Sequence, residues 1–152
     1  APTMPMLEEN YSKVLSVVKG AELATGARSK VTKVANTYAN TIPSKTLSDL
    51  FRENMAAVGV EYPEEKEVRQ GAASTDFGNV SQVMPALSAY INIGDVVLHS
   101  PEGAAMTATP EAYDAMIKAA KGLAFTTVDL ITEPELLDKA KREHSKRLEE
   151  QG

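Results

Sequence analysis

The sequence contains no cysteine, which excludes disulfide bonds and thiolate metal ligands. It has no tryptophan and only 5% aromatic residues, so its 43% hydrophobic content predicts a core of aliphatic side chains, alanine and methionine. No apolar run approaches the roughly 20 residues that a membrane span requires. The chain also begins without the basic region and apolar segment of a secretory signal. These absences favour a soluble protein of the cytoplasm.

The net charge of the chain is small and negative. Sixteen Lys and Arg face 21 Asp and Glu, which gives a net charge of −5. No cluster of basic residues stands out, whereas binding to a phosphate backbone relies on clustered Lys and Arg. The sequence therefore predicts no nucleic-acid partner and no membrane partner. Ala1 stands where an initiator methionine is expected and is followed almost at once by a helical pattern, which suggests a chain cut between structural elements.

Helical spacing of apolar residues recurs along the chain. It extends from about Met6 to Thr25, with Gly26 as a C-cap, and again from Ser44 to Gly59. A third helix begins at Thr109, and a fourth begins near Pro134 and ends in a charged tail. Ser44 and Thr109 fit the N-cap position, where a side-chain oxygen accepts a hydrogen bond from a free backbone N–H group.

Two stretches have the pattern of strands. Residues 30–35 are rich in β-branched side chains, and residues 88–94 alternate, with Ala89, Ile91 and Ile93 on one face. Alternating helices and strands favour a layered α/β domain. The first helix and strand cannot bury both faces alone, so we expect them to complete a small α+β unit.

The candidate site residues are a histidine and an aspartate. His99 follows an apolar run and precedes a turn, which suits a side chain presented at a strand end. Asp76 lies upstream in a Gly/Ser/Thr-rich turn, residues 71–80. Two such residues cannot complete a catalytic zinc site, which takes three protein ligands and a water. The alternatives are a structural role for His99 and a turn-forming role for Asp76 as cap of the next helix. His144, within a charged tail, is expected at the surface.

With these elements placed, the sequence resembles a known family. Residues 73–85, Ile93-Gly94 and Leu98-His99-Ser100 resemble the C-terminal part of the two-zinc amidohydrolases. This family includes aminoacylases, carboxypeptidase G, auxin-conjugate hydrolases and p-aminobenzoyl-glutamate hydrolase. The form Ser74-Thr75-Asp76 is most similar to the p-aminobenzoyl-glutamate and β-alanyl-dipeptide hydrolase branch. The resemblance extends through nearly all of the chain.

The resemblance implies a two-part architecture. Residues 1–40 resemble the C-terminal part of the family's lid, a small α+β domain that carries the dimer contact. Residues 41–152 resemble the C-terminal part of the catalytic domain, a layered α/β fold with a mixed sheet. The expected partners are accordingly the remainder of the same polypeptide and, through the lid, a second copy.

For the site, the resemblance implies two divalent metal ions, zinc with manganese or cobalt as alternatives. His99 matches the one metal ligand that the C-terminal segment contributes. Asp76, Thr75 and Asn40 match positions on the substrate side or next to the metal ligands. The general base is a Glu expected upstream, and no Glu-Glu pair of this chain fits it, so no catalytic residue is assigned here.

The function that the resemblance implies is metal-dependent hydrolysis of an amide bond. Substrates would be N-acyl amino acids, dipeptides or aryl-amide conjugates of amino acids, and the isolated chain would be inactive. The alternative is a non-catalytic module, derived from the same fold, that binds a partner without turning over substrate.

Overall fold

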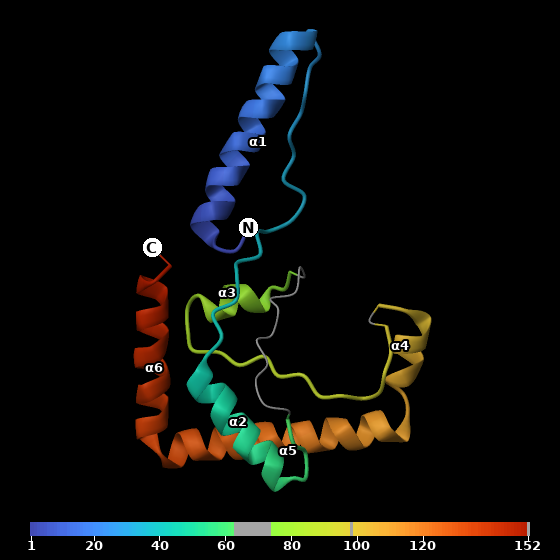
Figure 1. Ribbon diagram of the computed structural model, residues 1–152, viewed down its shortest axis with the longest axis vertical. Coiled ribbons are helices and arrows are strands. Elements are labelled where there is room, and N and C mark those ends of the chain that lie inside the picture. The colour runs from blue at the N-terminus through green and yellow to red at the C-terminus, as the bar shows by residue number, and fades with distance from the viewer. Residues whose placement is uncertain (63–73, 98, 152) are drawn as a thin grey trace.

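The computed structural model describes residues 1–62, 74–97 and 99–151 (Figure 1). Its elements are α1 (Met4–Thr25), α2 (Lys45–Ala57), α3 (Phe77–Ser81), α4 (Pro101–Met106), α5 (Pro110–Thr132) and α6 (Pro134–Glu149). Within these ranges there is no strand. None of the described helices has the length and apolar character that crossing a membrane requires.

The prediction of an α/β domain with a mixed sheet is therefore wrong for the described residues. Residues 30–35 and 88–94 run as irregular chain instead of strands (Figure 1). A strand exists only where its backbone N–H and C=O groups pair with a neighbouring strand. The alternating pattern records which side chains share a face, but it cannot supply that neighbour. Residues 71–73 of the predicted turn, and Leu98, lie outside the described residues.

The predicted helix ends are largely confirmed. The Ser44 hydroxyl accepts a hydrogen bond from Leu47 N at the start of α2, and the Thr109 hydroxyl caps α5 in the same way. Gly26 ends α1 with φ at 73°, in the left-handed region that glycine enters at no steric cost. These boundaries depend on capping residues that act on the adjacent backbone, and such residues can be identified directly in the sequence.

The core lies where α2 crosses α5. Phe51 and Met55 of α2 are buried, and Gly122 of α5 faces them. A Cβ at Gly122 would contact the Met55 sulfur, so the glycine allows the two helices to approach closely. Among the described residues, the buried hydrophobic ones are Ile42, Leu47, Phe51, Met55, Ala86, Ala112, Ala115 and Ala140.

By contrast, α1 contains no buried residue. Together with the chain that returns along residues 26–38, it extends away from the other helices (Figure 1). Ser29 N and Oγ donate to Glu22 Oε1 at 2.7 and 2.8 Å, which ties the returning chain to the end of α1. These bonds, with a further one from Lys19, lower the pKa of Glu22. The domain boundary at residue 40 stays a prediction, although every buried hydrophobic residue in the described ranges follows it.

Candidate functional site

Asn40 lies at a junction of three distant segments. Its Oδ1 accepts from Met4 N at 3.1 Å, at the start of α1. Its Nδ2 donates to Gln151 Oε1 at 2.7 Å, just beyond α6. Gln82, directly after α3, donates to the Asn40 backbone oxygen at 2.8 Å and to Oδ1 at 3.3 Å. Both ends of the amide are therefore engaged within the chain, which suits a residue that holds the surrounding segments in place.

Helix α3 lies against the segment that carries Asn40. Asn79 accepts from Ala39 N at 3.2 Å and donates to Thr37 O at 3.1 Å. A Cβ at Gly78 would overlap the Ala39 carbonyl oxygen, so only glycine allows this approach. These contacts bring Asn40 and the turn before α3 to neighbouring segments.

That turn presents two of the predicted site residues to solvent. Thr75 and Asp76 are both exposed, and the Thr75 hydroxyl donates to Asp76 Oδ1 at 3.5 Å and accepts from Phe77 N at 3.3 Å. Asp76 occupies the N-cap position of α3, yet its side chain makes no capping hydrogen bond. Its carboxylate therefore does not cap the helix, and the turn-forming alternative applies only to its backbone.

His99 lies on a separate segment. It is exposed and has φ at 60°, a left-handed conformation that is uncommon for a residue other than glycine. Ser100 follows it and caps α4 by accepting from Gly103 N at 2.9 Å. The irregular chain after α3 leads to α4, which lies apart from α3 (Figure 1). The structure therefore brings Asn40 close to the Thr75–Asp76 turn, and places His99 elsewhere.

The described residues do not by themselves fit a metal ion. Nowhere among them do three or more His, Asp or Glu side chains gather in a way that could hold one. A two-metal centre needs several ligands, and His99 offers one imidazole. Any further ligands would have to come from outside the described residues.

The prediction that His144 lies at the surface, which rests on its charged neighbours, is wrong. His144 is buried, with Nε2 2.7 Å from the backbone oxygen of Ser81. A carbonyl oxygen can only accept, so Nε2 carries the proton. Ser81, fully buried, also accepts through Oγ from Ile42 N at 2.9 Å. The signal available in the sequence was spacing, because His144 falls one helical turn after the apolar Ala140.

The sequence pattern also indicated no role for the neighbouring Glu143, which contacts α2. Its carboxylate accepts from Lys45 N at 2.6 Å and Thr46 N at 2.9 Å, in the first turn of α2. Burial raises the pKa of Glu143, but the hydrogen bonds from Thr46 and Lys45 and the charge of Arg147 outweigh it, so the pKa is lowered. An anion is stabilised here because free N–H groups and the helix dipole give the N-terminus partial positive charge.

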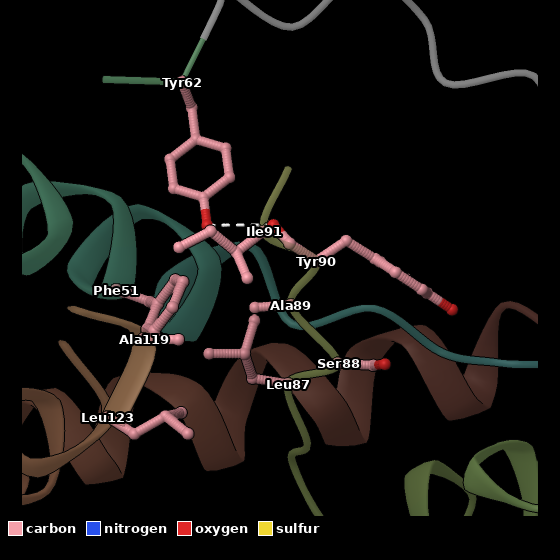
Figure 2. A pocket seen from close by; sticks show the side chains of 9 residues that line it. All are labelled: Phe51, Tyr62, Leu87, Ser88, Ala89, Tyr90, Ile91, Ala119 and Leu123. Carbon is pink, nitrogen blue, oxygen red and sulfur yellow. Dashed lines mark hydrogen bonds between the residues drawn. The ribbon is translucent and has the colours of Figure 1, made fainter. Parts of the chain in front are cut away.

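The larger pocket described is apolar (Figure 2). It has a volume of about 280 Å³ and lies between α2, α5 and the segment 87–91. Tyr62 closes one side, with its hydroxyl donating to Tyr90 O at 2.9 Å and its ring 6.2 Å from that of Phe51. Burial raises the pKa of the Tyr62 hydroxyl. A smaller pocket of about 240 Å³ is lined by Pro43, Lys45, Ser48 and Arg147. Neither contains His99 or Asp76.

Comparison with known proteins identifies two relatives. No family model matches the chain. It is 35% identical to the Xaa-Arg dipeptidase of Mus musculus over 153 residues, which cover 99% of this chain and 36% of that protein. It is 33% identical to the Xaa-Arg dipeptidase of Homo sapiens, with 99% and 35% covered. The chain thus spans about a third of the length of these curated relatives, and over that third it is similar to peptidases.

Proposed function

We propose that this chain forms part of a metal-dependent hydrolase that cleaves the amide bond of dipeptides. The observation that carries the proposal is the similarity of almost the whole chain to two proteins named for dipeptide hydrolysis. Their name specifies arginine as the second residue. Within the substrate range expected from the sequence, the comparison therefore favours dipeptides, with Xaa-Arg first, over N-acyl amino acids and aryl-amide conjugates.

Three side chains would contribute to the site. His99 would supply one metal ligand, and its exposure leaves the imidazole free to do so. Asp76 and Thr75 would lie on the substrate side, which their exposure also supports. A bound divalent ion would polarise the scissile carbonyl and activate a water. The remaining ligands and the general base would come from outside this chain.

A second candidate function has an observation of its own. The described residues contain no cluster of three metal-binding side chains. Judged by the family resemblance, no Glu-Glu pair of the sequence matches the catalytic base. This favours a non-catalytic module that binds a partner through the same fold. The two candidates differ in whether the polypeptide turns over substrate.

The test uses the polypeptide encoded by the whole uninterrupted reading frame that contains residues 1–152. Purified protein is incubated with Xaa-Arg dipeptides, other dipeptides and N-acetyl amino acids, and released amino acids are quantified by chromatography. We expect Xaa-Arg hydrolysis that is abolished by a chelator and restored by zinc or manganese. Absence of hydrolysis from every substrate, by folded and metal-loaded protein, would favour the non-catalytic module.

A further inference from the structure

Helix α5 is apolar on two opposite faces. Its inner face is buried against the other helices through Ala112, Ala115, Gly122 and Thr126. A second stripe, here called the outer stripe, consists of Tyr113, Ile117, Ala120, Ala124, Val128 and Ile131. Its members are spaced three or four residues apart, so they follow one side of the helix. All six are exposed, and the four large side chains are between 49% and 73% exposed.

This distribution of apolar residues differs from that of a helix at the surface of a complete globular protein. A surface helix shows one apolar stripe opposite a polar face, whereas a helix that is apolar on opposite sides lies inside a protein or a membrane. Helix α2 shows the usual surface pattern, because Phe51 and Met55 are buried while Arg52 and Glu53 lie away from the core. The apolar outer stripe is therefore the pattern of a helix that a further layer of protein covers.

We propose that the outer stripe of α5 docks against the polypeptide that corresponds to the two thirds of the Xaa-Arg dipeptidases beyond the matched region. This inference rests on the proposed function, because it takes those proteins as the template for the complete molecule. In both relatives the matched region accounts for only 35–36% of the length, so a body of ample size is present to cover the stripe. The side chains of Ala120 and Ala124, in the middle of the outer stripe, are small, so a covering segment can approach α5 closely there.

A second copy of this chain is the competing occupant, and the distribution of apolar residues disfavours it. Val17 and Leu23 on α1 are 70% and 79% exposed, in a part of the molecule remote from α5 (Figure 1). A two-fold dimer buries the same patch on both subunits. A dimer through α5 would therefore leave the apolar residues of α1 uncovered, so a second copy on the outer stripe does not account for them.

The experiment uses the absence of cysteine from these residues. Three variants each replace one alanine with cysteine: Ala124→Cys on the outer stripe, Ala56→Cys as an exposed control on the polar side of α2, and Ala115→Cys as a buried reference. Each is made in the isolated chain and in the polypeptide of the whole reading frame. Maleimide labelling is followed by peptide mapping in a mass spectrometer, so other cysteines do not interfere.

In the isolated chain, we expect Ala124→Cys to label as fast as Ala56→Cys. In the longer polypeptide, its labelling should be slower by at least about tenfold, because a covered thiol reacts only after local opening, while Ala56→Cys is unchanged. Equal labelling of the two in the longer polypeptide contradicts the proposal. So does a reading frame that ends with these residues, or protection of Ala124→Cys in the isolated chain that grows with concentration, which identifies a second copy.

The labelling experiment tests the docking surface, and the hydrolysis assay tests the proposed activity, so the two proposals can fail independently. Protection of Ala124→Cys without dipeptide hydrolysis would retain the docking surface and reject the proposed activity. Hydrolysis with an unprotected Ala124→Cys would retain the activity and reject the docking surface.

Discussion

At the residue scale, Gly122 determines how closely α5 approaches α2. In Gly122→Ala the new Cβ would contact the Met55 sulfur and lie 3.2 Å from Phe51 Cε2. Both side chains are buried, so overpacking should outweigh the better helix propensity of alanine and lower the free energy of unfolding by about 1–2 kcal/mol. Urea denaturation followed by circular dichroism measures the change.

The matched control for that substitution is Gly20→Ala in α1. Nothing lies within 4 Å of a Cβ at that position. The control should therefore show only the propensity gain of alanine, with helicity retained or increased. An equal effect of the two substitutions would contradict the packing role of Gly122.

The predicted site residues give a second test at this scale, in the longer polypeptide. His99→Ala should lower metal content and dipeptide hydrolysis together, because it removes a ligand. Asp76→Asn should lower hydrolysis by about tenfold or more while most of the metal stays bound, as for a residue next to the ligands. Metal content is measured by atomic emission and hydrolysis by chromatography. Asp114→Asn, an exposed carboxylate paired with Lys118, is the control. Unchanged metal and activity in His99→Ala would reject the ligand assignment.

At the element scale, the helix boundaries could be predicted and the strands could not. Ser44, Thr109 and Gly26 act through hydrogen bonds or backbone angles within a few residues, so the local sequence contains the whole cause. Residues 30–35 and 88–94 have strand-like patterns, but pairing depends on another segment. The candidate site shows the same division. The local composition of the turn at Asp76 indicates that it is exposed, but the sequence does not indicate that His99 lies elsewhere.

The roles of α6 could not be read from its own sequence. This helix and the residue just beyond it contact two separate segments: residues 40–46 through Glu143 and Gln151, and Ser81 through His144. The residues that each contacts are 63 to 111 positions away in the chain. Charged residues at helical spacing usually indicate a solvated face, and only the fold shows that two of these side chains are structural.

The contact between Glu143 and α2 predicts a pH dependence. The folded-state pKa of Glu143 lies below its ordinary value of 4.5, so the ionised carboxylate stabilises the fold. That contribution is fully present above the unfolded pKa and is lost as pH falls through the folded pKa. Glu143→Gln should lower the free energy of unfolding by about 1 kcal/mol at neutral pH, and the difference from the parent protein should shrink below about pH 4.5.

Urea titrations at a series of pH values check this prediction. Glu53→Gln is the control, because Glu53 lies exposed on α2 and makes no hydrogen bond or ion pair within the described part of the chain. A difference between Glu143→Gln and the parent that stays constant down to pH 3 would show that the carboxylate charge contributes nothing.

At the scale of the whole molecule, Asn40 joins α1 to the other helices. Asn40→Ala removes the side-chain bonds to Met4, Gln82 and Gln151. Loss of these partly buried bonds should lower the free energy of unfolding by about 1–3 kcal/mol and speed proteolytic cleavage between α1 and α2. Asn92→Ala removes one exposed, local bond, to Gly94 N, and should change neither quantity. Equal cleavage rates in the two variants would contradict the junction role.

The last prediction concerns the isolated chain of 152 residues. Its described part offers no cluster of three metal-binding side chains, and a single imidazole exchanges zinc freely with buffer. We therefore expect the isolated chain to retain less than one equivalent of zinc after gel filtration and to leave Xaa-Arg dipeptides intact, even when circular dichroism shows it to be helical. Adding zinc should produce neither stable zinc retention nor dipeptide hydrolysis, because the metal does not supply the missing ligands and the missing base. Hydrolysis that copurifies with the isolated chain and disappears in His99→Ala would show instead that these residues contain a complete site.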